Sequence, residues 1–219
     1  MAAAKAAARG SVRRLRLTLL GVGTMSAPRY APAGLLIRWG PVRVAIDGRP
    51  GAEPPGTLDA WLVTDEHAEL RAALRRLAHK YGLAGPAITD YAAPGLRVRP
   101  YPVEHTSHRA CGYQISAGCR IAVWAPEFWR FPDWADGADL MFAEAAAWDR
   151  PIRFRGGAGG HAPVTQVAAE AARRGIGRLG YAHICAAGAA GDGRWVAPVV
   201  RRMGSRGRTY NLPNLPGRP

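Results

Sequence analysis

Four polar side chains that could bind a metal follow one another where a buried strand is predicted to end. In the stretch WLVTDEHAEL, residues 61–70, the apolar Trp61–Val63 reads as the end of that strand. The polar side chains that follow are Asp65, Glu66, His67 and Glu69. Carboxylate oxygens and imidazole nitrogens are ligands for divalent metals. Acidic residues at such a position also suit the N-terminus of a helix. The stretch is therefore either a metal-binding loop or the charged start of a helix.

Five of the six histidines lie at the ends of predicted strands or in the adjoining loops. Besides His67 these are His105, His108, His161 and His183. Glu127 likewise follows an apolar stretch, VWAP. Imidazoles ligate metals and transfer protons near neutral pH, so this set could hold a metal beside a general acid or base. Taken alone, His67 also fits a solvated first turn of a helix and His183 a histidine packed in the core, and His79, beside Lys80 on a predicted helix surface, is given no role.

A glycine-rich stretch, RGGAGGHA, leads into His161. It lacks the Lys-Ser/Thr pair of a nucleotide-binding P-loop. Because glycine lets a backbone approach its neighbours closely, we interpret the stretch as a loop that presents His161.

The apolar patterns predict the strands and helices that position these residues. The predicted strands span residues 15–24, 33–40, 41–47, 58–64, 96–103, 111–118, 119–126, 138–145 and 178–184. Leucines recur at helical spacing in a predicted helix over 68–82, and a proline and a glycine are placed as the caps of a second helix over 163–175. This order predicts sheets covered by outer helices.

Length and composition are those of a globular protein. The chain has 219 residues, enough for one domain with a substantial core, and contains 48% hydrophobic and 21% charged residues. No apolar run approaches the roughly 20 residues that span a bilayer, so no membrane partner is expected. The three cysteines form no C-x-x-C pair, which favours reduced thiols and a cytoplasmic protein.

The net charge of +14 is concentrated at the two ends of the chain. Residues 1–16 carry five basic residues and no acid, and residues 192–219 carry six basic residues and one acid. The predicted organisation is a disordered basic extension over 1–14, one domain over 15–190 and a basic, Pro/Gly-rich tail over 191–219. Such ends either bind nucleic acid non-specifically or stay solvated, and both interpretations remain open.

Several segments, in order, resemble the metallo-β-lactamase-fold hydrolases, most closely the branch of ribonuclease Z and related phosphodiesterases. LLGVGT and VAIDGRPG are similar to a first strand ending in L-G-T-G and a later strand ending in I-D-x-G. HTSHRACGYQI and ADLMFAEAA resemble the segments H-x(n)-G-Y-x-I and A-D-x-L-x-H-E-A, and GGHAPVTQ with YAHI resembles the close of the family pattern. The resemblance runs over roughly residues 16–185. It implies an α/β (α+β) fold with the four layers of an αββα sandwich.

The resemblance also implies roles for single residues. The family loop T-H-x-H-x-D-H corresponds to TDEHAEL, residues 64–70, in which only the middle histidine is kept. The implied metal ligands are Asp65, His67, His105, Glu127 and His183, with His108 as the rival of His105. The implied catalytic residues are His161, which matches the histidine that binds no metal, and Glu69, which replaces the aspartate. Leu70 cannot ligate, which implies one metal ion rather than two.

The expected function is therefore metal-dependent hydrolysis of a phosphoester, either a small molecule or a nucleotide. The expected cofactor is one divalent metal, zinc before manganese or iron. The implied ligands are expected to converge at one rim of the sandwich, where such folds gather their strand ends. The alternative is a non-catalytic member of the fold that has lost its metals and binds a ligand or nucleic acid. A homodimer is compatible with either function, and the lack of a long tRNA-binding arm argues against processing of pre-tRNA.

Overall fold

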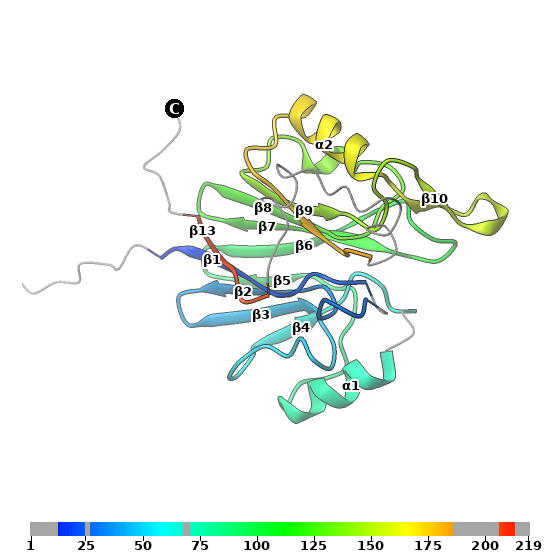
Figure 1. Ribbon diagram of the computed structural model, residues 1–219. Helices are drawn as coiled ribbons and strands as arrows, with labels where there is room; N and C mark the ends of the chain where they lie inside the picture. Colours follow the sequence, from blue (N-terminus) through cyan, green and yellow to red (C-terminus); the bar gives the residue numbers. More distant parts are fainter. Residues whose placement is uncertain (1–12, 25–26, 68–70, 186–205, 213–219) are drawn as a thin grey trace, which may run out of the picture.

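Two β-sheets stack on each other in the computed structural model, which describes residues 13–24, 27–67, 71–185 and 206–212 (Figure 1). The first sheet has the strand order β13-β1-β2-β3-β4 and the second has the order β12-β9-β8-β7-β6-β5. Helix α1 (Arg71–Lys80) lies outside the first sheet, and helix α2 (Val164–Arg173) lies outside the second. This arrangement confirms the predicted four-layer αββα sandwich.

The nine segments predicted from the apolar patterns each contain a strand, and β5, β10, β11 and β13 were not predicted. The strands of the first sheet are β1 (Leu15–Gly21), β2 (Gly34–Trp39), β3 (Val42–Asp47), β4 (Ala60–Leu62) and β13 (Thr209–Leu212). Those of the second are β5 (Tyr91–Ala93), β6 (Leu96–Pro102), β7 (Cys111–Ala117), β8 (Arg120–Ala125), β9 (Leu140–Glu144) and β12 (Leu179–Ala182). A separate ribbon pairs β10 (Ile152–Arg153) with β11 (Gly160–His161), and two short 3-10 helices span Asp133–Ala135 and Arg155–Gly157.

Alternation along the strands explains how the sheets stack. In β1 the side chains of Leu15, Leu17 and Leu19 are fully buried, whereas Arg16 between them is exposed. Burying a leucine side chain contributes roughly 1.5–3 kcal/mol, so this one strand supplies a substantial part of the core. β9 differs, because all five of its residues are buried. A strand that is covered on both faces does not alternate between buried and exposed side chains.

Parallel pairing brings the ends of several strands to one rim. β9 runs parallel to both β8 and β12, and β3 runs parallel to β4. The carboxyl ends of parallel strands lie at the same edge of a sheet. The residues that follow β8 and β12 and the last residue of β9 are therefore brought together. The residues that follow β4 join them from the first sheet, where the N–H of Cys111 donates to the carbonyl of Thr64 at 2.9 Å.

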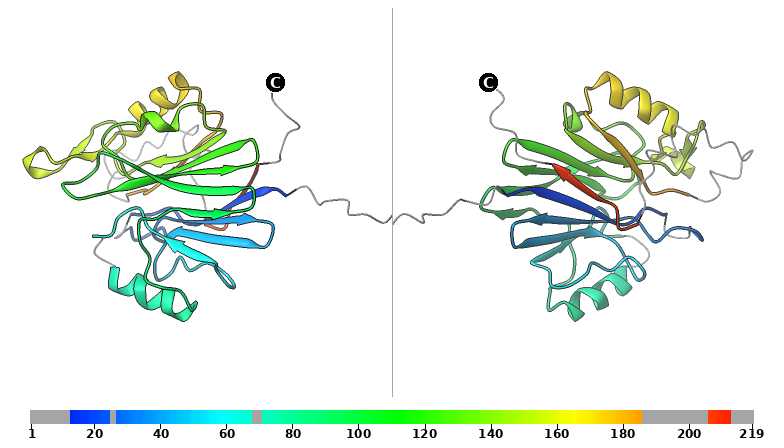
Figure 2. Two further views of the ribbon diagram at one scale, coloured as in Figure 1. Left: turned by 180° about the vertical axis from the view of Figure 1, so that it is seen from behind. Right: turned by 60° about the vertical axis from the view of Figure 1, so that its left-hand side comes forward.

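The end of the chain differs from its predicted organisation. Residues 209–212, placed by the sequence in the tail over 191–219, form β13, which pairs antiparallel with β1 from Leu15↔Leu212 to Thr18↔Thr209. Figure 2 shows β13, in red, beside β1, in blue. Leu212 is buried, and the ring of Tyr210 packs against that of Phe142 in β9, so this short strand is held by an existing sheet edge and the core beside it. The composition of the segment gave no sign of that edge.

The remaining residues of the two predicted ends lie outside the described residues, except for Arg13, Arg14 and residues 206–208. Across the part of the chain that the structure describes, no helix has the length and apolar character that a bilayer crossing requires.

Candidate functional site

A cavity of about 470 Å³ opens at the rim where β3, β4, β8 and β12 end. Its wall includes every described residue of the predicted site: Asp65, His67, His105, Glu127, His161 and His183. The predicted catalytic Glu69, together with Leu70, lies outside the described residues. The residues expected to converge do meet at one rim, and the role of each as a ligand or catalyst stays a prediction.

Glu127 joins two histidines in this cavity. Its Oε2 lies 3.0 Å from Nε2 of His105, and its Oε1 lies 2.9 Å from Nε2 of His183. Burial alone would raise the pKa of Glu127, but the two imidazoles hold it well below its ordinary value. Burial alone would lower the pKa of His183, but Glu127 and Glu144 together raise it to about 10. The ring of His183 is therefore protonated at neutral pH and pairs with the carboxylate of Glu127.

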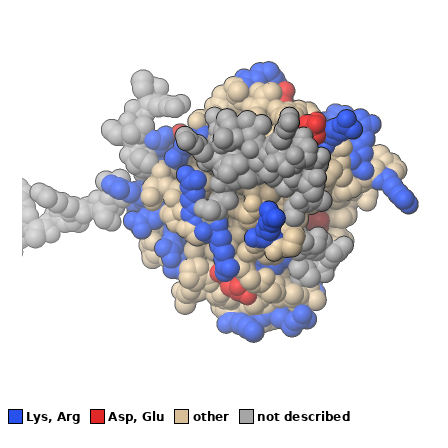
Figure 3. Space-filling model, viewed as in Figure 1, with Lys and Arg blue, Asp and Glu red and all other residues tan. Residues whose placement is uncertain are grey.

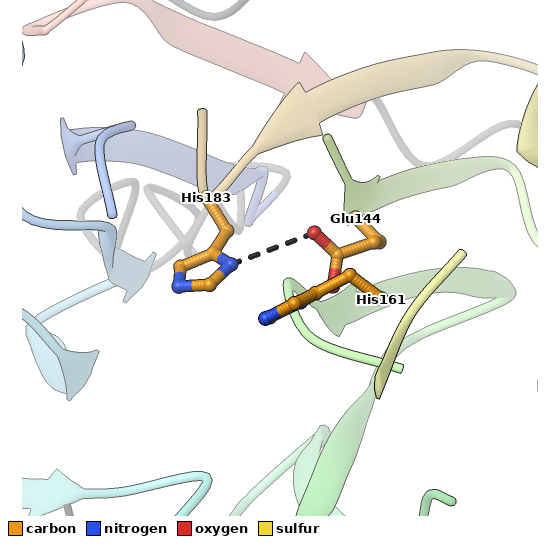
Figure 4. A group of neighbouring side chains, drawn as sticks. All are labelled: Glu144, His161 and His183. Atoms are coloured by element: carbon orange, nitrogen blue, oxygen red, sulfur yellow. Dashed lines mark hydrogen bonds and ion pairs between the residues drawn. The ribbon is translucent and has the colours of Figure 1, made fainter. Parts of the chain in front are cut away.

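Glu144, at the end of β9, lies behind this group and was not predicted as a site residue. It is fully buried, and its oxygens accept backbone hydrogen bonds from Phe128 at 3.2 Å and Ala146 at 2.7 Å. Nδ1 of His161 donates to Oε2 of Glu144 at 2.8 Å, and Nδ1 of His183 lies 3.5 Å from its Oε1. Figure 4 shows both imidazoles directed at the one carboxylate. One ligand atom from each of the three side chains lies within 4.8 Å of the others, close enough to hold a metal ion.

Glu144 is unusual both in its pKa and in its position in an otherwise apolar strand. Burial would raise its pKa, but hydrogen bonds from His161 and His183 lower it below the ordinary value. A carboxylate is rarely fully buried unless it is paired in this way. A lone acid that ends the otherwise apolar strand LMFAE was the available signal in the sequence.

The glycine-rich loop holds His105 rather than simply presenting His161. The backbone N–H of Gly160 donates to the carbonyl of His105 at 2.8 Å, and Nδ1 of His105 donates to the carbonyl of Gly160 at 2.9 Å. A Cβ at Gly159 would overlap the His105 carbonyl, and one at Gly160 would overlap the carbonyl of Ile152. The predicted close approach of this backbone is confirmed. Because Nδ1 of His105 is engaged, its Nε2 faces Glu127.

Asp65 and His67 belong to a second group of contacts within the same cavity. Oδ2 of Asp65 lies 2.7 Å from Nε2 of His108, and its Oδ1 accepts the backbone N–H of His67 at 2.7 Å. The exposed His67 ring lies 5.0 Å from the His108 ring, centroid to centroid. Glu66 accepts the N–H of Ile88 at 2.7 Å and has a structural role. Of the two rival histidines, His105 is therefore the one beside Glu127.

At the end of each of two strands at the rim, one residue has a left-handed backbone conformation. Asp47, at the end of β3, has φ of 53°, and His183, after β12, has φ of 59°. Such a conformation costs a non-glycine residue roughly 1–3 kcal/mol and persists where the surroundings impose it. Asp47 accepts hydrogen bonds from the backbone of Thr64 and the indole of Trp124, both at 2.7 Å, and burial raises its pKa to about 6. It ties the two sheets together beneath the cavity.

No protein-family model matches the sequence, and no curated protein matches it. Solved structures do. The metallo-β-lactamase-fold protein YhfI from Bacillus subtilis matches with a TM-score of 0.70 at 14% identity, over 91% of this chain and all (100%) of YhfI. Zn²⁺-bound PqqB from Methylobacterium extorquens matches with a TM-score of 0.69 at 15% identity, over 90% of this chain and 100% of PqqB. A diphosphatase from the PhnP family matches with a TM-score of 0.62 at 18% identity, over 91% and 97% of the two chains. At these identities the likeness shows the fold alone, which is that of the metallo-β-lactamases.

Proposed function

We propose that this chain is a metal-dependent hydrolase that cleaves a phosphoester bond in a small anionic substrate. The observation that carries the proposal is Glu127, held between the Nε2 atoms of His105 and His183 in the wall of the cavity. These three side chains hold one divalent cation, zinc before manganese or iron, and leave one position open, as catalytic zinc sites with three protein ligands do. When bound there, the cation supplies Lewis acidity toward the phosphoryl oxygen and activates water.

The two pairings of Glu127 support this ligand set. Bond lengths of about 2.0–2.2 Å in a tetrahedral zinc site separate neighbouring donor atoms by about 3.3 Å. The separations of 3.0 and 2.9 Å from Glu127 to the two imidazoles are close to that value, and they start from its two different oxygens, so each oxygen faces one ring. A metal ion bound there would replace the protons between Glu127 and the two imidazoles, since a metal ligand must be deprotonated.

Glu144 is better suited to orient ligands than to bind the metal itself. Both of its oxygens already accept backbone N–H groups, and its side chain is not in the cavity wall. Metal-binding histidines commonly donate their second N–H to a carboxylate, which fixes the ring and its tautomer. Glu144 stands in that relation to Nδ1 of His183.

His161 is the proposed proton carrier of the reaction. Its Nδ1–H is taken by Glu144, which leaves Nε2 to accept or donate a proton in the cavity. Its ring lies 4.8 Å from the His105 ring and 5.2 Å from the His183 ring, centroid to centroid. That places it beside the proposed metal ligands, where a leaving oxygen would need a proton.

Two arginines in the cavity wall support an anionic substrate. Arg49 and Arg75 both line the cavity. Nη1 of Arg49 is buried, and no residue in the described ranges accepts a hydrogen bond from it. Guanidinium groups match phosphate oxygens in geometry and charge. A cavity of about 470 Å³ is of the size that takes a small molecule.

Hydrolysis of bis(4-nitrophenyl) phosphate by the full chain, with Zn²⁺ or Mn²⁺ added, tests the proposal. We expect turnover that EDTA abolishes, and a loss of about 10²- to 10⁴-fold in kcat in His161→Gln while zinc is still bound. His79→Gln changes an exposed histidine of α1 and should keep the activity of the parent chain. A zinc-loaded chain without turnover would contradict phosphoester hydrolysis and support a non-catalytic binding role for the fold.

A further inference from the structure

A groove lined by arginines lies at the other end of the first sheet. Its volume is about 560 Å³, and it is lined by Arg13, Arg14, Arg16, Arg38, Gly40, Pro41 and Arg43. We call this set the arginine groove. Five of its seven residues are arginines and none is acidic. In Figure 3 basic side chains gather at the left edge of the molecule, where β1 begins.

Three of these arginines stand side by side on neighbouring strands. Arg16 of β1 is directly opposite Arg38 of β2, and Arg38 is directly opposite Arg43 of β3. Residues directly opposite one another project from the same face, with Cβ atoms about 4.5–5.5 Å apart, and like charges in such positions destabilise a sheet. The fold therefore keeps three cations in a row at a cost in stability.

The described residues form no ion pair with this row. None of the ion pairs formed by the described residues includes an arginine of the groove. The Nε atoms of Arg38 and Arg43 are buried and have no acceptor among the same residues. Arg13 donates to the carbonyl of Pro94 at 3.1 Å, and Arg43 donates to that of Pro55, so two of the side chains are held in place. Cations that are held in place and have no ion-pair partner in the described ranges are suited to an anion that brings several acceptors.

We propose that the arginine groove binds the phosphate backbone of nucleic acid. Arginine matches phosphate oxygens with a planar fork of donors, and a row of cations one strand apart suits a chain of phosphates better than a single anion. A bilayer surface is disfavoured, because binding to one normally adds apolar anchors. The large apolar side chains found exposed among the described residues are Tyr30 and Ile152, and neither lines the groove.

The groove is distinct from the proposed metal centre. Arg43 lies near the start of β3, whereas Asp47 ends that strand beneath the cavity. Four residues of extended chain span roughly 13 Å. Binding of nucleic acid there does not depend on a bound metal. This inference can therefore be tested independently of the proposed hydrolase activity.

Fluorescence anisotropy of a labelled single-stranded oligouridylate, titrated with the full chain in EDTA, tests the inference. The double variant Arg16→Gln/Arg38→Gln should bind at least about tenfold more weakly, with a slope of log K against log salt reduced by about 2. The double variant Arg16→Lys/Arg38→Lys keeps the charge and should keep most of that slope. Thermal melting of each variant establishes that it is folded.

Arg173→Gln/Arg178→Gln removes the same charge from exposed positions on and after α2, and should leave the affinity nearly unchanged. Equal weakening by both Gln double variants would overturn the inference, because the effect would then follow net charge rather than the groove. It would also be overturned if the parent chain ignored the oligonucleotide but bound phosphatidylserine vesicles through Arg16 and Arg38.

Discussion

At the scale of single residues, the site consists of two carboxylates, each paired with two imidazoles. Glu144 is fully buried and Glu127 is partly buried. Their different surroundings separate their roles. Glu127 faces the cavity with no described partner besides the two histidines, whereas Glu144 is saturated by backbone donors. We therefore assign metal binding to Glu127 and positioning to Glu144.

Glu144→Gln tests the positioning role. The amide can still accept from one imidazole but carries no charge to hold the Nδ1–H of His161 and His183. We expect kcat on bis(4-nitrophenyl) phosphate to fall, KM to change little, and metal affinity to fall by about 10- to 100-fold, as for other residues that orient metal ligands. A variant with the full kcat and pH profile of the parent chain would refute the assignment.

Proton release on metal binding tests the state of His183. Its pKa is raised to about 10 in the metal-free protein, so the ring is protonated across the neutral range. Because a metal displaces that proton, affinity for zinc should rise with pH up to about 10, by about tenfold per unit for one proton. Calorimetry at about pH 7 in buffers of different ionisation enthalpy should find at least about one proton released per zinc. Binding without proton release would contradict the pairing with Glu127.

The same pairing predicts a pH dependence of folding. A histidine with a raised pKa in the folded state contributes stability that is complete below its unfolded pKa, about 6.5, and is lost as pH rises to about 10. The free energy of unfolding of the metal-free chain should therefore decrease over this interval. Urea titrations at several pH values, with His183→Gln as the comparison, measure it. A parent chain that loses no more stability than His183→Gln over this interval would contradict the prediction.

At the scale of elements, the sequence predicted the positions of the strands more reliably than the contacts made by the residues at their ends. The apolar patterns placed β1 to β4, β6 to β9 and β12 because each strand buries a recognisable face. They could not reveal that β8, β9 and β12 run parallel, which is what brings Glu127, Glu144 and His183 together. Glu144 was missed for this reason. Asp65 and His67 were grouped with Glu127, but their local contacts instead lead to His108.

The glycine loop gives a test at this scale. Gly159→Ala places a Cβ against the carbonyl of His105 and strains a residue with φ of 122°. We expect a loss of roughly 2–3 kcal/mol in unfolding free energy, together with weaker zinc binding as His105 moves. Gly157→Ala is the matched control, since Gly157 also has a positive φ, 73°, but open space around it. Equal effects of the two substitutions would show that the close approach to His105 is unimportant.

At the scale of the whole molecule, the fold uses a short strand from far along the chain to cover an edge. β13 pairs with β1 although 191 residues separate Thr18 from Thr209, whose hydroxyls are 2.9 Å apart. The sequence could not predict this strand, because Thr209–Leu212 has the composition of a tail and is held by long-range contacts, with β1 and through Tyr210 with Phe142 of β9.

Two truncated chains test that contribution. A chain ending at residue 205 lacks β13, and a chain ending at residue 212 keeps it. We expect the shorter chain to melt several degrees lower, because the edge of β1 and the core beneath Leu212 become exposed. Differential scanning calorimetry of the two chains makes the comparison. Equal melting temperatures would mean that β13 contributes nothing to stability.

The central claim is that Glu127, with His105 and His183, holds the metal of this molecule. Calorimetric titration of the metal-free full chain with Zn²⁺, alongside Glu127→Gln and Asp65→Asn, tests it most directly. We predict one zinc per chain, bound tightly by the parent, bound at least about tenfold more weakly by Glu127→Gln, and bound with little change by Asp65→Asn, whose contacts lead to His108. Undiminished binding by Glu127→Gln, or no binding by the parent chain, would contradict the claim.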